Sequence, residues 1–254
     1  APGAANYVVT LLESKTNAEK RRKDSPIAVV GAGVIGLFTA YELVHRGYTD
    51  ITIIADQFEG ITSDNAAGLL APVSMDNSPR MQAVIDKIGV EAYRFYRSVA
   101  EKKQKDIKTG ARVIPAYFES RSDSGLEPYV GVVMEPAKDV VLDFGNGTKR
   151  AMVAYDDSIF MDTAVLMREL RSTLETVAKF EKRKIEKLTD LPHRLVFDCA
   201  GMGSAALNSD TNMVSVQGHL IMLKDQKPQD LDYMALVYLD TGKTKSGQKI
   251  KRSF

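Results

Sequence analysis

The feature that most constrains the fold is a run of strand, glycine turn and helix patterns over residues 27–47. Residues 27–30 read Ile-Ala-Val-Val, which predicts a strand buried on both faces, and glycines follow at positions 31, 33 and 36. Residues 34–47 then place apolar side chains on one helical stripe before a glycine ends the helix. This succession predicts a parallel α/β sheet with a diphosphate-binding turn.

Each glycine of the turn has its own expected role. Gly31 allows a sharp turn off the strand, Gly33 leaves room for phosphates beside the main chain, and Gly36 lets the helix pack closely on the strand. The backbone amides of Val34 and Ile35 lie at the positive end of the helix dipole, where phosphates bind. Residues 27–41 contain no lysine or arginine, so the backbone would supply the charge. An ordinary strand-to-helix turn is the alternative interpretation.

A second strand and a long loop follow this helix. Residues 50–56 predict a parallel strand with Asp56 at its carboxyl end, where an acid can accept hydrogen bonds from ribose hydroxyls. A simple turn acid is the alternative for Asp56. Gln57 begins a loop over residues 57–72 that is rich in hydroxyl-bearing and small side chains. Thr62 and Ser63 can donate to phosphate oxygens, and the small residues leave room for a flat ring system.

This loop resembles a segment of the D-amino acid oxidase family of flavoproteins. In that family a loop of type T/S-T/S-x-x-A-A-G-L runs along the FAD pyrophosphate and beneath the flavin. The matching residues here are Thr62, Ser63, Ala66, Ala67, Gly68 and Leu69. The resemblance therefore implies FAD as the cofactor.

The resemblance continues further along the chain, with departures. Residues 179–185 resemble the family's strand that contacts the adenine, and residues 194–201 resemble a later strand that ends against the cofactor. Residues 213–224 resemble the strand after it, with His219 where the family often has glutamine. Gln57, Ala71 and Ala200 stand where arginine, a polar residue and threonine are usual. The cofactor-binding residues expected are Gly31, Gly33, Val34, Ile35, Gly36, Asp56, Gln57, Thr62, Ser63, Ala67, Gly68, Leu69, Ile185, Ala200 and Gly201.

The fold class expected is α/β, with a Rossmann-like FAD-binding domain interleaved with a mixed α+β substrate domain that is incomplete. The FAD-binding domain is expected over residues 26–78 and 161–224, and the substrate domain over residues 79–160 and 225–254. Helices are expected at 80–103 and 161–178, and strands at 111–119, 130–134, 140–144 and 150–155. The first 24 residues are expected to form a solvated helix or tail.

Composition limits the kinds of partner. The chain has 254 residues, 44% hydrophobic and 26% charged, and a net charge of +1, so a soluble small-molecule protein is expected with no nucleic-acid or membrane partner. The single cysteine, Cys199, excludes an internal disulfide and is expected to be a packing residue. The three histidines form no metal site by spacing. An intracellular location, cytoplasmic or peroxisomal, is expected.

The resemblance also implies a reaction: FAD-dependent oxidation of a D-amino acid by molecular oxygen, giving a 2-oxo acid, ammonia and hydrogen peroxide. The family's substrate-gripping residues have no counterpart before Phe254, so a fragment is expected and no catalytic side chain is nominated. A glycine- or sarcosine-type or other secondary-amine oxidase would share this cofactor half. A nicotinamide-dependent dehydrogenase would share the glycine turn but not the loop over residues 62–72. A non-catalytic dinucleotide-binding subunit is the remaining alternative.

Overall fold

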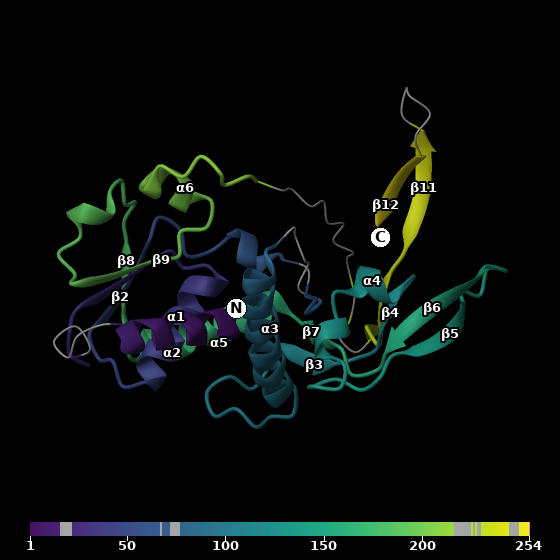
Figure 1. Ribbon diagram of the computed structural model, residues 1–254. Coiled ribbons are helices and arrows are strands. Elements are labelled where there is room, and N and C mark those ends of the chain that lie inside the picture. Colours follow the sequence, from purple (N-terminus) through teal and green to yellow (C-terminus); the bar gives the residue numbers. More distant parts are fainter. Residues whose placement is uncertain are drawn as a thin grey trace. The chain divides into compact units, whose positions relative to one another are not determined.

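The chain forms two compact units, each assembled from separate stretches of sequence (Figure 1). The computed structural model describes residues 1–15, 22–66, 68–71, 77–215, 225, 227, 230–243 and 249–253. The first unit contains Ala1–Gly68, Ser98–Gly110 and Met161–Ile221, and the second contains Leu69–Arg97, Ala111–Phe160 and Met222–Phe254. Parallel and mixed sheets occur in one chain, which confirms the predicted α/β class. The predicted domain boundaries stay predictions, and residues 98–110, expected in the substrate domain, group with the first unit.

The first unit is built on a four-stranded parallel sheet in the order β8-β2-β1-β9. The strands are β1 (Ile27–Val30), β2 (Ile51–Ala55), β8 (Lys179–Lys182) and β9 (Leu195–Asp198). Every residue of β1 and β2 is buried, as the continuous apolar runs predict for central parallel strands. Ile27 lies opposite both Ile51 and Leu195, so all the carboxyl ends reach the same edge of the sheet.

Helices cover one face of this sheet. Helix α2 (Val34–His45) packs on β1, β2 and β9, and α1 (Pro2–Lys15) and α5 (Thr163–Glu175) both pack against α2. Figure 1 shows these three helices on the same side of the sheet. The opposite face carries an apolar cluster against which Leu207 of α6 (Gly203–Asn208) packs; its buried members are Ala28, Val30, Ile54 and Leu191.

The solvated helix or tail expected over the first 24 residues is wrong for α1. Ala5 and Val9 are fully buried, and Glu13 accepts a 2.6 Å hydrogen bond from Arg46 at the end of α2. Arg46 also donates to Thr10 at 2.8 Å. The buried side chains of this helix are small, and its polar side chains form ion pairs. Its sequence therefore shows only a weak apolar pattern, although the helix is packed against α2.

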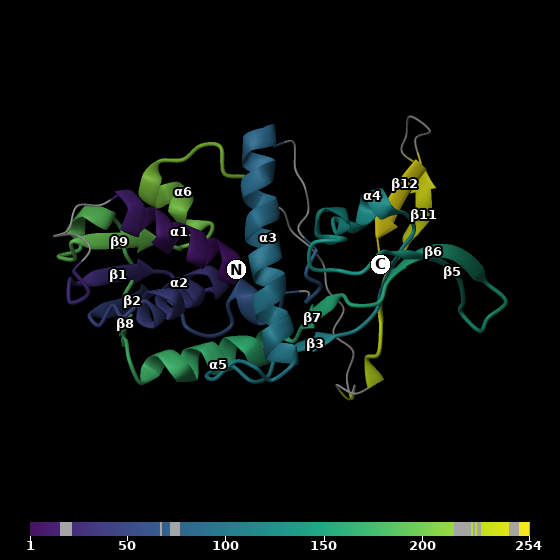
Figure 2. The same cartoon turned by 60° about the horizontal axis from the view of Figure 1, so that its bottom comes forward.

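The second unit contains a mixed sheet in the order β10-β4-β6-β5, of which Figure 2 labels the β5–β6 hairpin. Its strands are β4 (Ala116–Phe118), β5 (Lys138–Asp143), β6 (Lys149–Tyr155) and β10 (Met234–Leu236). The β5–β6 hairpin turns at Gly145-Asn146-Gly147, as predicted, and both glycines have positive φ. The other elements are α3 (Pro79–Ala100), α4 (Arg121–Ser124), the strand pair β3 (Ala111–Val113) with β7 (Ile159–Met161), and the hairpin of β11 (Tyr238–Lys243) with β12 (Lys249–Ser253).

Two predicted strands differ from those observed. The strand predicted at 111–119 is divided into β3 and β4. The amide of Ile114 donates to the carbonyl of Ser158, and Pro115 has no amide to donate. The strand predicted at 130–134 is a tight turn, in which Gly131, at φ +75°, donates to the carbonyl of Met134. The two predicted helices are confirmed as α3 and α5.

Candidate cofactor site

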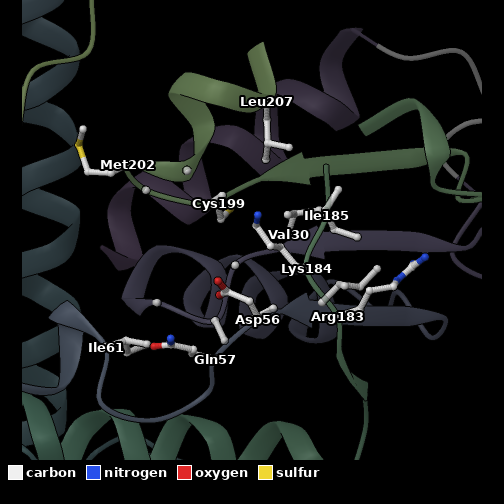
Figure 3. Close-up of a pocket in the computed structure, with 18 of the residues that line it drawn as sticks. Val30, Asp56, Gln57, Ile61, Arg183, Lys184, Ile185, Cys199, Met202 and Leu207 are labelled. Carbon is white, nitrogen blue, oxygen red and sulfur yellow. The ribbon is translucent and has the colours of Figure 1, made fainter. Parts of the chain in front are cut away.

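A pocket of about 570 Å³ lies at the carboxyl edge of the parallel sheet (Figure 3). After β1 the chain crosses to β2 on one side, whereas β9 lies on the other side, so the strand order reverses at β1. Open parallel sheets bind ligands in the crevice at such a switch point. The pocket is lined by segments that follow all four strands, namely residues 30–33, 54–57, 60–63, 183–186, 199–203 and 206–207.

The glycine turn after β1 forms the base of the pocket. Gly31 has φ +108°, and a Cβ there would lie 2.2 Å from the carbonyl oxygen of Cys199. A Cβ on Gly36 would lie 2.0 Å from the carbonyl oxygen of Gly31, so these two glycines permit close packing of backbone on backbone. A Cβ on Gly33 would meet only the Ser63 hydroxyl, at 3.3 Å. Gly33 therefore leaves open the space in front of the helix.

The first turn of α2 presents backbone amides that can bind an anion. Its N-cap, Gly33, has no side-chain cap, and the first turn carries no acidic residue. The first intrahelical bond runs from Leu37 to the carbonyl of Gly33, so the earlier amides have no partner within the helix. The Val34 amide donates to Ser63 Oγ at 3.0 Å, which leaves the Ser63 proton for another acceptor. A diphosphate fits this arrangement because it accepts from amides and hydroxyls alike.

Charged groups lie at the ends of β2 and β8. Asp56 is exposed and lines the pocket directly after β2. Lys184 Nζ bonds to Glu186 Oε1 at 2.8 Å, and this bond raises the pKa of Lys184, with a smaller contribution from Asp56. Figure 3 shows the Asp56 and Lys184 side chains in the same part of the pocket. Asp56 keeps its carboxylate available to hydroxyl donors such as those of a ribose.

An apolar wall completes the pocket. The wall contains Val30 and Ile54 at the strand ends. Ile185 and Leu207 also belong to it and pack on the apolar cluster on the sheet face opposite α2. Such a wall suits a flat aromatic base. Cys199 also lines the pocket, and burial raises the pKa of its thiol to about 11. The thiol stays protonated, consistent with a packing cysteine.

The structure brings most of the predicted cofactor residues together. Those that line the pocket are Gly31, Gly33, Asp56, Gln57, Thr62, Ser63, Ile185, Ala200 and Gly201. Val34, Ile35 and Gly36 form the first turn of α2 beside it. Gly68 is instead buried where its carbonyl accepts the amide of Met161 at 2.7 Å, and Leu69 pairs with Phe160 in the second unit. Ala67 and residues 216–224, with His219, lie outside the described residues. The cofactor roles of all these residues stay predictions.

Sequence reasoning missed several residues of the pocket. Arg183 and Lys184 lie within residues 179–185, which were expected to contact the adenine, but only Ile185 was named individually there. Glu186 follows this segment, and the turn after β9 leads into α6, which contributes Gly203, Ala206 and Leu207. These residues could have been predicted from their positions, because residues just after a parallel strand lie at the same edge of the sheet as the glycine turn. Their local sequence is charged or small and indicates no ligand by itself.

Among the described residues, two further classes of site find no support. They contain no group of three or more histidine, cysteine, aspartate or glutamate side chains able to hold a metal ion. Their helices are also all too short or too polar to cross a membrane.

A parallel sheet whose switch point carries a glycine-lined anion site defines a dinucleotide-binding α/β protein. The family described as FAD dependent oxidoreductase matches residues 26–244, and the chain belongs to this family. The predicted family and the predicted cofactor, FAD, are thereby confirmed. The glycine cradle, the acid after β2 and the apolar wall all fit FAD.

Two similar proteins of this kind are oxidases of D-amino acids. The chain is 28% identical over 216 residues to D-aspartate oxidase from Homo sapiens and 24% identical over 222 residues to D-amino-acid oxidase from Dictyostelium discoideum. These alignments cover 78% and 83% of this chain but 59% and 62% of the two relatives, so the chain spans about three fifths of their length. The solved structure of iminodiacetate oxidase from Chelativorans sp. BNC1 has a similar fold, with a TM-score of 0.54 at 15% identity, over 72% of this chain and 57% of that one.

Proposed function

We propose that this chain is the FAD-binding part of an oxidase that acts on the carbon–nitrogen bond of a D-amino acid. The observation that carries the proposal is the pocket at the sheet edge, in a chain that matches the FAD dependent oxidoreductase family over residues 26–244. Similarity to D-aspartate oxidase and D-amino-acid oxidase supports a D-amino acid as the substrate.

In the proposed reaction the substrate loses a hydride from its α-carbon and a proton from its amine. The resulting imino acid is hydrolysed by water to a 2-oxo acid and ammonia. FAD supplies the two-electron acceptor, and molecular oxygen takes up these electrons to give hydrogen peroxide. The residues of this chain bind and orient the cofactor: the first turn of α2 and Ser63 hold the diphosphate, and Asp56 accepts from the ribose.

A second candidate is a glycine- or sarcosine-type or other secondary-amine oxidase. The cofactor half is shared between such enzymes, since fold does not fix the substrate. The similarity in fold to iminodiacetate oxidase favours keeping this candidate. A non-catalytic dinucleotide-binding subunit is the third candidate, because the chain spans about three fifths of its relatives.

The test begins with the purified chain and added FAD. The absorption spectrum of bound flavin is recorded first, and peroxide release is then measured with D-amino acids, their L-enantiomers, glycine and sarcosine. Bound flavin with turnover of D-amino acids alone supports the proposal. Turnover restricted to glycine or sarcosine replaces it with the second candidate. Because this chain spans about three fifths of its relatives, turnover is also measured in a longer chain that carries the remaining part, and bound flavin without turnover in both chains replaces the proposal with the third candidate. Failure to bind flavin overturns all three.

A further inference from the structure

Helix α6 forms one wall of the cofactor pocket, yet little in its own sequence holds it in place. It has six residues, its N-cap Met202 makes no side-chain cap, and none of its residues is fully buried. Isolated helices of this length are unstable in water, because too few hydrogen bonds offset the ordering of the backbone. The position of α6 therefore depends on contacts with its surroundings.

One side chain, that of Asp198, makes several polar contacts with α6 and with the turn before it. Asp198 ends β9, and its Oδ1 accepts hydrogen bonds from the Ala200 amide at 3.1 Å and the Ser204 hydroxyl at 2.8 Å. Its Oδ2 accepts a hydrogen bond from Asn208 Nδ2. A carboxylate only accepts, and all three partners donate, so the polar groups match. Bonds of this type, with a charged acceptor, are stronger than neutral ones.

The three donors are spread along the whole segment after β9. Ala200 is in the turn that contains Gly201 at φ +57°, Ser204 is in the first turn of α6, and Asn208 is its last residue. Asp198 thus links the carboxyl end of β9 to both ends of α6. Leu207, between these anchors, packs on the apolar cluster beside Ile185 (Figure 3).

We propose that Asp198 is a positioning residue for the FAD site. Its carboxylate holds the turn after β9 and helix α6 as a wall of the pocket, while Asp198 itself is outside the pocket lining. The proposal rests on FAD binding at this pocket. It concerns affinity for the cofactor, and the sheet beneath keeps its own packing through β1 and β2.

An exchange of hydrogen-bond partners tests the proposal. Asp198→Asn keeps one oxygen for Ala200 and Ser204 but turns its amide group toward Asn208. Asn208 can accept from that group only by rotating its own amide, which gives up the bond from its Nδ2 to the Ser204 carbonyl. Asn208→Asp in the same chain restores an acceptor opposite that donor. The dissociation constant of FAD is measured by flavin fluorescence, and the thermal midpoint of the FAD-free protein is measured by circular dichroism.

The expected results are specific. Asp198→Asn weakens FAD binding by roughly 10-fold, as expected for a lost hydrogen bond to a charged group, and the double variant returns to within about 3-fold of the original protein. Asp198→Ala weakens binding further. Asp210→Asn is the matched control, because Asp210 accepts the Asn212 amide in a similar turn beyond α6 and outside the pocket lining. Its FAD affinity is expected to be unchanged.

Two outcomes overturn the proposal. Unchanged FAD affinity in both Asp198 variants excludes a positioning role, and so does a loss that the double variant does not rescue. If Asp198→Ala fails to fold, the comparison of Asp198→Asn with the double variant still decides. Failure of the unsubstituted chain to bind FAD would instead overturn the proposed function, so the two failures are distinguishable.

Discussion

At the scale of single residues, the glycines of the first turn have separable roles. A side chain at Gly31 or Gly36 would collide with backbone at 2.2 or 2.0 Å, whereas one at Gly33 would meet only Ser63 Oγ. Gly33 has φ −71°, which any residue can adopt. A substitution at Gly33 is therefore expected to impair cofactor binding, whereas a substitution at Gly31 or Gly36 is expected to impair folding.

Gly33→Val is expected to fold normally and to weaken FAD binding by roughly 100-fold, or about 2.7 kcal/mol, because the side chain enters the space for the diphosphate. Gly36→Ala is expected to lower the free energy of unfolding by about 1–3 kcal/mol through overpacking. FAD titration and urea unfolding of both variants check these expectations. Normal flavin affinity in Gly33→Val would contradict the placement of the cofactor.

Cys199 gives a prediction about pH. Burial raises the pKa of its thiol to about 11, so only about one molecule in a thousand carries the reactive thiolate at pH 8. Alkylation by iodoacetamide, followed by intact mass, is expected to be slow at pH 8 and to rise about 10-fold per pH unit up to the pKa. The chain has one cysteine, so the mass change is unambiguous. Rapid labelling of the folded protein at pH 8 would contradict this expectation, and urea-unfolded protein is the positive control.

At the scale of elements, helix α5 depends on a side-chain cap. Asp162 accepts the Val165 amide at 3.1 Å and is the N-cap of a helix that packs against α2. Asp162→Ala is expected to lower the free energy of unfolding by about 1 kcal/mol, whereas Asp162→Asn, which keeps an acceptor, is expected to lower it by less. Urea denaturation measures both values. Equal losses in the two variants would show that the cap does not stabilise α5.

Elements with a strong periodic pattern were predictable, and those fixed by distant contacts were not. The runs that became β1 and β2 contain only residues suited to burial, and α5 begins at an acid followed by apolar residues at helical spacing. Helix α1 was misjudged because its buried residues include small ones such as Ala5, and its ion pairs reach Arg46. The strand predicted at 130–134 failed because Gly131 reverses the chain within an apolar run.

The same distinction holds within the site. The glycine turn, Asp56 and Ser63 were predictable because the chemistry of a diphosphate and a ribose dictates their types. The contacts of Asp198 were not, since they join β9 to α6 through side chains whose types occur equally in any turn. Gly68 was expected at the cofactor from resemblance; the structure pairs its carbonyl with the Met161 amide, and its cofactor role stays a prediction.

At the scale of the whole molecule, the pocket is lined by segments far apart in the sequence, from Val30 to Leu207. No shorter stretch of chain contains every wall. During synthesis, flavin binding is therefore expected only after α6 has emerged from the ribosome. Because bound FAD adds its binding energy to the folded state alone, the flavin content of the purified protein is expected to report the fraction of molecules whose sheet and α6 are assembled.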